Sequence, residues 1–551
     1  MTRGYPLLVC ALAASTLPAS AQQALSPLDS AVHALNRLTW GTRPGMADSI
    51  ARSGVMLWLE TQLAVTRPGD PALAERERAF PVLRASSEDL VRELTEMRQA
   101  RATRRAQSGD SGARMGPDPR TRNPDASDRR AFRLLGPQLQ QATLVRAVEA
   151  EDQLAEVMAD FWFNHFNVYQ NKGLDRALLP AYVEKTIRPR SLGRFEDLLI
   201  ATAKSPAMLF YLDNVQSVAP GATPPQLERL ERLRGRAARV RPGGPQRMDS
   251  LRQAIERRRP TGLNENYARE LLELHTLGVD GGYTQQDVTE VARVFTGWGV
   301  GAPRDGGTAR FQYHEWAHDR GGKTVLGSAF PPGGEEEEGV RLLRLLAGHP
   351  STIHFVSGKL CARLVSDVPP DGCVDAAVAA WRRSDGNIRE ILRAIVRSPE
   401  FWSSGAMGTK VKTPVEFVVS AMRAVGGVPD STPRLAMQLV GLGQPLYLQS
   451  APMGYPETQE DWVNSGALLA RMNFAMALAS GRLPGVTLDL DGLISADLDR
   501  ESLIETVDRV ILNGRMRPST RAVIAKELAD ITDPMQARAL VVGLAIGGPE
   551  F

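Results

Sequence analysis

The residues from Asn264 to Gly278 contain an unusual density of side chains that could carry out chemistry. This stretch has three carboxylates, an arginine, two asparagines and a histidine on a background of leucines. Ionisable groups beside an apolar stripe cost desolvation energy unless they pair with one another or take part in a reaction. We therefore expect Glu270 or Glu273 to act as a general base or a metal ligand, assisted by His275.

A helix over residues 265–277 would position these side chains. Helical spacing brings the two glutamates onto one face and places the histidine among the apolar residues of another face. Arg269 on the same helix is a candidate substrate contact. The alternative is a solvated acidic face, in which Arg269 pairs with Glu265 or Glu273 and no chemistry takes place.

A second group of candidates lies on a glycine-flanked loop. His318 and Asp319 are neighbours, and the loop ends in Gly-Gly-Lys323. A histidine and an aspartate on such a loop can bind a metal or orient a base, so both are candidate catalytic residues. Lys323 would then contact an anionic group of the substrate. The alternative is a turn that the aspartate stabilises.

A further helix is expected to begin at Thr284, where Thr-Gln-Gln-Asp has the form of a capping box. Asp287 and Glu290 are candidate metal ligands, and Arg293 and Trp298 are candidate substrate contacts. The alternative assigns Asp287 to the helix cap and makes Glu290 and Arg293 a surface ion pair of little energetic value.

A divalent metal ion is the candidate cofactor, because carboxylates and imidazoles together suit zinc, manganese or iron. The candidate ligands are His165, Glu270, Glu273, Asp287 and Glu290. His165 belongs to a helix that is apolar nearly all round, so its alternative role is a hydrogen-bonded core residue. Asp160, Asn164 and Asn167 form a polar line on another side of that helix. The sequence lacks the Glu-x-x-His pattern of di-iron bundles, the His-Glu-x-x-His and Gly-x-Ser-x-Gly motifs, and a phosphate-binding glycine loop.

The pattern of apolar residues predicts a mainly α protein, a large multi-helix array with long loops and at most a small β-hairpin. That hairpin would join residues 311–314 to residues 323–326. No fixed internal period is present, so a repeat solenoid is not expected. We expect one large helical domain over residues 22–551. Its later helices are predicted at 339–347, 351–366, 374–382, 387–397, 413–425 and 463–479.

Residues 1–21 have the form of a secretory signal peptide, with a basic start, an apolar run and Ala-Ser-Ala before the cleavage point at Ala21. The alternative is a retained membrane anchor. No later stretch approaches a membrane-spanning length, so we expect a periplasmic or extracellular protein.

After cleavage of the signal peptide, two cysteines would remain, Cys361 and Cys373. An even count in an oxidising compartment favours a disulfide between them, and the alternative is two separate thiols.

Two arginine-rich insertions give the chain its net positive charge. Residues 98–133 hold ten arginines and four aspartates, and we expect disorder there. Residues 216–260 hold eleven arginines and four acidic residues between Glu228 and Arg259, and should form a surface excursion. Either could bind an acidic glycan, an anionic surface or a protein partner. No basic face with interleaved aromatic residues runs through the chain, so a nucleic-acid partner is not expected.

Several motifs are long and rich in uncommon residues. They are His33-Ala-Leu-Asn-Arg-Leu-Thr-Trp-Gly41, Phe161-Trp-Phe-Asn-His-Phe166, Tyr211-Leu-Asp-Asn214, the Asn264–Gly278 stretch, Gly282-Tyr-Thr-Gln285, Ala292-Arg-Val-Phe-Thr-Gly-Trp298 and His318-Asp-Arg-Gly-Gly-Lys323. Together they resemble the bacterial domain of unknown function eighteen hundred, over residues from about 28 to 545.

This resemblance implies an exported, largely helical protein without an established reaction. Members are often encoded beside a second exported family that resembles sulfatases, the domain of unknown function fifteen hundred and one, which implies such a protein as a partner. The chain departs from the family pattern by its two arginine-rich insertions and by the lack of a twin-arginine pair in its signal.

Two hypotheses follow for the function. In the first, the protein is a hydrolase or lyase, metal-assisted or not, that acts on cell-surface or extracellular polymers. In the second, it is a non-catalytic scaffold or assembly partner of another exported protein, and the polar motifs are ion-pair networks that fix helix packing. The enzyme hypothesis is favoured because these residues come from separate segments and could converge on one cleft. If His165, Glu270, His275 and His318 lie far apart, a single site built from them is excluded.

Overall fold

A computed structural model describes residues 25–64, 70–108, 124–225, 227–229, 231–233, 262–301 and 308–551. The predicted signal peptide lies outside these residues, as do residues 109–123 of the first arginine-rich insertion and most of the second. The two ends of the first insertion differ from the predicted disorder, because one helix continues to Ser108 and the next begins at Pro124.

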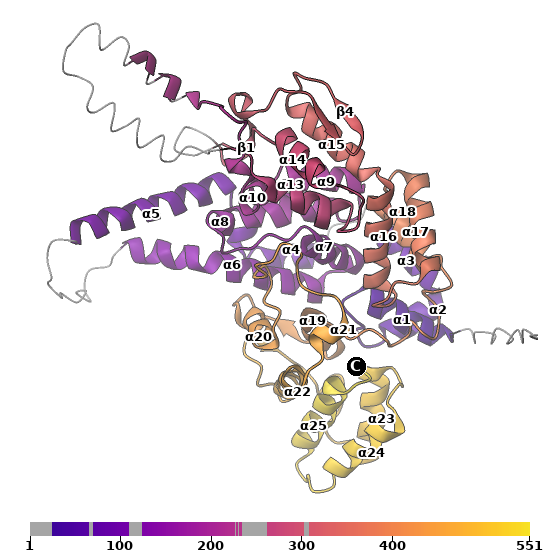
Figure 1. The fold of residues 1–551 in the computed structure, drawn as a ribbon. Coiled ribbons are helices and arrows are strands. Elements are labelled where there is room, and N and C mark those ends of the chain that lie inside the picture. Colours follow the sequence, from indigo (N-terminus) through magenta and orange to yellow (C-terminus); the bar gives the residue numbers. More distant parts are fainter. Residues whose placement is uncertain are drawn as a thin grey trace, which may run out of the picture.

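Helices make up most of the described chain (Figure 1). The helical segments before the second insertion are α1 (Pro27–Leu38), α2 (Met46–Ser53), α3 (Val55–Leu63), α4 (Pro71–Glu77), η1 (Pro81–Leu83), α5 (Ser87–Ser108), α6 (Pro124–Glu149), α7 (Gln153–His165), α8 (Asp175–Ala181), η2 (Tyr182–Ile187), η3 (Arg188–Arg190), α9 (Phe195–Ala203), α10 (Pro206–Tyr211) and η4 (Asn214–Gln216).

The chain continues as helices after that insertion. They are α13 (Glu265–Glu270), η5 (Leu271–Thr276), α14 (Gln285–Val294), η7 (Glu315–Ala317), α15 (Glu336–Ala347), α16 (Pro350–Leu364), α17 (Asp371–Ser384), α18 (Ile388–Arg397), α19 (Pro414–Ala424), α20 (Arg434–Leu442), α21 (Gln459–Trp462), α22 (Ser465–Ala479), α23 (Arg500–Val507), η8 (Asp508–Leu512), α24 (Pro518–Glu527) and α25 (Pro534–Gly547).

Within the described ranges, strands form three small antiparallel pairs: β1 (Trp298–Val300) with β2 (Phe311–Tyr313), β3 (Lys323–Val325) with β4 (Ser328–Phe330), and β5 (Val428–Pro429) with β6 (Val486–Thr487). The predicted hairpin between residues 311–314 and 323–326 was wrong in its pairing, although both segments contain strands. Leu326 and Gly327 both have positive φ, at 48° and 74°. Such a two-residue turn closes β3 directly onto β4 and leaves β2 to pair with β1.

One hydrophobic cluster extends from Ala34 to Ile546 and joins most of the helices. The apolar helix α7 lies near its middle, with Phe161 and Trp162 buried in the core, and its label stands at the centre of Figure 1, between α13 above and α19 below. Among the described helices, none combines the length and the apolar character that a membrane crossing would need. Because α7 is packed by other helices on most sides, the polar side chains that it carries must have partners or enclose a cavity.

Local sequence signals explain where several helices begin. Thr284 and Asp287 form the predicted capping box of α14, and Thr413 and Glu416 form a second box at the start of α19.

Cys361 on α16 and Cys373 on α17 are joined by a disulfide, with the sulfur atoms 2.08 Å apart.

Candidate functional site

The carboxylates of α13 and η5 lie in a partly exposed ionic network. Arg269 lies 3.6 Å from Glu265 and 3.5 Å from Glu273, and it donates a hydrogen bond of 2.8 Å to Gln285. The Glu270 carboxyl makes no hydrogen bond with the described residues, and its pKa is raised by partial burial and by the nearby Glu273. The geometry is that of the solvated acidic face, in which Arg269 is engaged by neighbouring side chains.

His275 and His165 lie in the core, away from this network. The Nε2 atom of His165 is 3.1 Å from the carbonyl oxygen of His275, and the two rings pack among Phe166 and Phe355. Burial lowers the pKa of His275 to about 3 and holds the pKa of His165 well below its ordinary value. Both rings are therefore neutral at neutral pH and serve the packing of α7 against η5.

The His318 loop forms a buried ionic cluster with a partner that the sequence did not suggest. Lys323 Nζ lies 2.8 Å from Glu338 Oε2, and His318 Nε2 lies 3.1 Å from the same oxygen. Lys323 also donates to the carbonyl oxygens of Asp319 and Gly321. The Lys323 side chain is fully enclosed and all of its hydrogen-bonding capacity is used inside the fold, so the structure favours a role in stability over the predicted contact with substrate.

The candidates on α14 are also engaged in the structure. Arg293 bonds to Asp319 at 2.8 Å and to Glu290 at 2.7 Å, while Asp287 caps α14 and accepts from the Leu326 amide at 2.7 Å. Trp298 was predicted to contact substrate, but it is only 1% exposed. These positions follow the structural alternatives rather than a substrate-binding role.

The predicted metal ligands are not brought together. Within the described residues, no group of three or more His, Cys, Asp or Glu side chains could hold a metal ion. The structure does not gather His165, Glu270, Glu273, Asp287 and Glu290 into such a group. Its histidine lies in the core, two glutamates lie on the partly exposed face of α13 and η5, and the α14 carboxylates are engaged by Thr284 and Arg293.

The structure instead gathers polar side chains around a cavity beside α7. The cavity has a volume of about 30 Å³. A water molecule needs roughly 10–15 Å³ of such space, so there is room for about two. It lies between α7, α16, the start of α19 and the loop 444–457. The side chains that matter for chemistry are Asp160, Asn164, Arg363, Thr413, Tyr455 and Glu457.

Asp160 is the central group of this site. Its carboxyl is partly buried and has no hydrogen-bond partner among the described residues, although every neighbouring polar residue of the cavity has one. Burial raises the pKa of Asp160 to about 7, with Arg363 lowering the pKa and Glu457 raising it. A carboxyl with a pKa near neutrality can both donate and accept a proton at physiological pH.

Arg363 is held firmly at the edge of the cavity. Its Nη1 donates to Oε1 of Glu416, and its Nε lies 3.8 Å from Oε2 of Glu457. The other oxygen of Glu416 accepts from the Thr413 amide at 2.7 Å as part of the capping box of α19. Burial alone would raise the pKa of Glu416, but Arg363 and the Thr413 amide lower it overall, so Glu416 remains ionised. The guanidinium is thus positioned by a helix terminus.

Two asparagines of α7 bind the loop over the cavity. Asn164 donates to the carbonyl oxygen of Tyr455 at 2.8 Å and accepts from the Tyr455 amide at 2.7 Å. Asn167 donates to the carbonyl oxygens of Gln449 and Ala451. Gly454 has φ of 79°, and a Cβ there would lie 2.3 Å from the carbonyl oxygen of Asn164. Only glycine allows this approach, so the loop is fitted closely onto α7.

Sequence reasoning recognised the polar line of Asp160, Asn164 and Asn167 but gave it no role. This polar line was the feature of the sequence that could have indicated the site, because three polar residues on one side of an apolar helix require partners. Arg363 and Glu457 were missed. Neither stands in a distinctive local pattern, and their relation to α7 arises only from packing.

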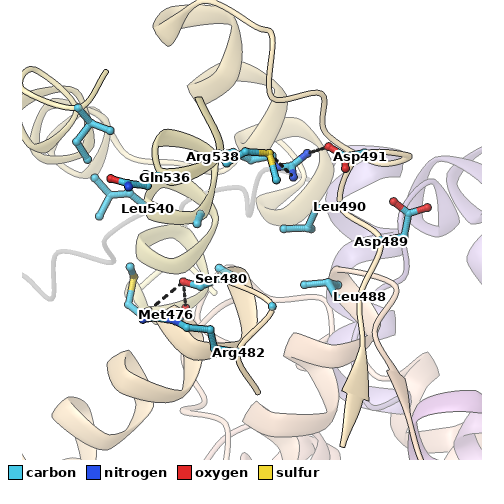
Figure 2. Close-up of a pocket in the computed structure, with 15 residues that line it drawn as sticks. Met476, Ser480, Arg482, Leu488, Asp489, Leu490, Asp491, Gln536, Arg538 and Leu540 are labelled. Carbon is cyan, nitrogen blue, oxygen red and sulfur yellow. Dashed lines mark hydrogen bonds and ion pairs between the residues drawn. The ribbon is translucent and has the colours of Figure 1, made fainter. Parts of the chain in front are cut away.

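A larger hollow of about 600 Å³ lies between α22, residues 488–491 and α25. In Figure 2, Arg538 and Asp491 point toward each other and are joined, whereas Asp489 lies apart from them. Arg538 also donates to the carbonyl oxygen of Ile494, and Asp489 accepts from the Gly492 amide. The polar groups here are used to hold the loop, so the smaller cavity beside α7 is the better candidate for chemistry.

Comparison with known proteins places the chain in a family but assigns no reaction. No curated protein and no solved structure matches it. The model of one family, described as protein of unknown function (DUF1800), matches residues 33–551 and so covers α7, α16, α19 and the loop that enclose the cavity. The chain therefore belongs to the DUF1800 family of proteins of unknown function.

Proposed function

We propose that this protein is an exported hydrolase or lyase of cell-surface or extracellular polymers, in which Asp160 transfers the proton. The observation that carries the proposal is the Asp160 carboxyl, which lacks a hydrogen-bond partner among the described residues and opens onto a cavity beside Arg363 and Glu457. A carboxyl in a cavity whose pKa is strongly raised by burial is a candidate for a functional site.

The chemistry of the cavity suits proton transfer at a polar bond. The protonated Asp160 would donate its proton to a leaving oxygen, and the ionised form would take a proton from water or from a carbon acid. Arg363 offers N–H groups to an oxygen that gains negative charge during the reaction. The cavity has room for about two water molecules, which is enough for a hydrolytic water beside the bond that is broken.

The substrate class rests on different support. The signal-like residues 1–21 suggest export, and polymers of the envelope and its surroundings are the abundant substrates there. Since the cavity admits only a small group, the reacting bond would enter it while the rest of the chain lies outside, against the loop that contains Tyr455 and Glu457.

The test compares Asp160→Asn with the control Asp530→Asn. Asp530 is an exposed aspartate in the turn that follows α24. Both mature chains would be assayed on polysaccharide and ester substrates, and circular dichroism would check the fold. Loss of Asp160 as a proton donor should reduce the rate about 100-fold or more, whereas the Asp530 variant should keep parental activity. Equal activity in all three chains, on any substrate that the parent cleaves, would remove Asp160 from the mechanism.

A scaffold or assembly role is the second candidate, and exposed apolar side chains favour it. Met437 and Val440 on α20 are 63% and 61% exposed, and Leu468 and Leu469 on the contacting helix α22 are 52% and 62% exposed. Exposed apolar residues on adjoining helices suit a protein partner. The candidate partner is an exported sulfatase-like protein. Co-purification with it, lost in a Val440→Gln and Leu469→Gln double variant, would support this role; no complex at micromolar concentration would argue against it.

A further inference from the structure

A second enclosed cavity contains an excess of positive charge. It has a volume of about 80 Å³ and lies between α1, residues 407–412, the start of α19 and the segments around residues 515 and 550. Four cationic side chains from separate parts of the chain line it, namely Arg37, Lys410, Lys412 and Arg515. Cations are seldom gathered in an enclosed space unless a negative charge offsets them.

Among the described residues, three of these cations form hydrogen bonds only with main-chain oxygens, although Lys412 also lies 4.3 Å from the centre of the Phe551 ring. Arg37 Nη2 donates to the Ala406 carbonyl oxygen at 2.7 Å, and its Nε is buried without a partner. Arg515 Nε donates to the Leu512 carbonyl oxygen at 3.2 Å, and Lys412 Nζ donates to the main-chain oxygen of Phe551. Lys410 differs, because it forms an ion pair with Asp367 at 2.5 Å.

Two carboxylates also line the cavity, but cations outside it engage both. Glu416 is held by Arg363 and by the Thr413 amide. Glu550 Oε1 accepts from Arg517 and from Thr520, each at 2.7 Å. Glu416 also attracts Arg37 and Lys412, but it is shared with Arg363, so the cavity keeps an excess of positive charge. Burial, followed by the nearby Arg515, lowers the pKa of Lys412 to about 7, and a bound anion would favour the charged form of this lysine.

The cavity also holds two acceptor atoms that lack a donor within the described part of the chain. The ring of His33 is bonded to the Phe401 carbonyl oxygen through one nitrogen, and the other, Nε2, is buried without a partner. A neutral imidazole that donates through one nitrogen accepts through the other. Glu550 Oε2 is likewise buried without a partner. An ion that suits this cavity must therefore bring negative charge for the cations and an O–H donor for these acceptors.

We propose that this cavity binds phosphate as the monohydrogen ion. Its charged oxygens would bond to Arg37, Lys412 and Arg515, and its P–OH group would donate to His33 Nε2 or to Glu550 Oε2. Sulfate has the same shape and charge but no proton to donate near neutral pH, so it would leave both acceptors unpaired. The structure thus assigns the site a preference for phosphate over sulfate. The inference is independent of the reaction proposed for Asp160.

The test is calorimetric titration of the mature chain with inorganic phosphate and with sulfate at pH 7.5 and matched ionic strength, in a buffer free of both ions. We expect saturable binding of phosphate that is about tenfold tighter than that of sulfate, because sulfate leaves a buried acceptor without a donor. Titration with glycerol 3-phosphate at the same pH separates a free ion from an esterified group. Glycerol 3-phosphate carries no P–OH proton at this pH, so it should bind more weakly than inorganic phosphate. Tighter binding of the ester, or equal affinity for sulfate, would overturn the assignment to monohydrogen phosphate.

Matched variants localise the binding. Lys412→Met should weaken phosphate binding about tenfold or more, since it removes one charged donor, and Arg515→Gln provides a second variant if the first folds poorly. The control is Lys526→Met, which removes an exposed lysine of α24 and should leave the affinity unchanged. Phosphate binding that survives both cavity variants, or the absence of binding in the parent, overturns the proposal.

Phe551 lies beside Lys412, so a carboxylate at that residue could itself occupy the cavity. A chain with a glycine-serine extension after Phe551 is therefore titrated alongside the parent. Binding in both chains supports an ion from solution. Binding only in the extended chain would overturn the proposal, because the chain's own carboxylate would then fill the cavity in the parent.

Discussion

Arg363 on α16 and Glu416 on α19 form an ion pair that links the two cavities. Arg363 lines the cavity beside α7, Glu416 lines the cationic cavity, and their side chains are only 7% and 20% exposed. The pair joins a residue that faces Asp160 to the capping box that begins α19. A change at either residue should therefore affect both the stability of the fold and the proposed site.

Glu416→Gln should destabilise the protein by about 3–5 kcal/mol, because it leaves the Arg363 guanidinium buried without its partner. Urea unfolding of the parent and the variant measures the difference. The Arg363→Met and Glu416→Gln double variant should recover part of the loss, since it removes the unpaired charge. A cost below about 1 kcal/mol for the single variant would mean that the pair behaves like an exposed one.

Asp160→Asn should change how stability depends on pH. The pKa of Asp160 is about 7 in the folded protein, above its ordinary value of 3.8, so the folded state binds a proton that the unfolded state releases. The parent therefore loses stability as the pH rises from about 4 to about 7, and the asparagine variant avoids this loss. Urea unfolding should show the variant gaining about 1–3 kcal/mol relative to the parent at pH 8 compared with pH 4. A constant difference across this range would show that Asp160 titrates normally.

Gly454→Ala should disturb the loop over the cavity. The substitution imposes a positive φ on alanine and places its Cβ 2.3 Å from the carbonyl oxygen of Asn164. Gly443→Ala is the matched control, because Gly443 also has positive φ, at 92°, but nothing lies within 4 Å of its Cβ. We expect the Gly454 variant to be less stable than the control by about 1–3 kcal/mol in urea unfolding. Equal losses would indicate that the loop can move away from α7 at little cost.

Lys323→Met should act on stability rather than on substrate binding. Lys323 neutralises Glu338 inside the fold, next to His318, and its removal leaves that carboxylate buried without the lysine. The expected loss is about 3–5 kcal/mol in urea unfolding, whereas Lys526→Met should change stability by less than about 0.5 kcal/mol. If Lys323 instead contacted substrate, the variant would keep its stability and show a raised KM for the substrate that the parent cleaves.

The sequence by itself determined the fold class and the local elements. The mainly α prediction was confirmed, and the helices predicted after residue 339 correspond to α15–α19 and α22 with small shifts at their ends. The capping box of Thr284 and Asp287 was also confirmed. These features depend on apolar periodicity and on side chains that bond within a few residues of themselves, so they can be recognised from neighbours in the chain.

Only the tertiary structure decided which polar residues meet. The density of charge around Glu270 suggested a site, yet the nearby Arg269 engages two of the glutamates there, and the histidines of the same motifs turn into the core. The cavity beside α7 depends on contacts such as that between Asn164 and Tyr455, which are 291 positions apart. Such contacts follow from the packing of the whole core, because no local pattern specifies the partner across that distance.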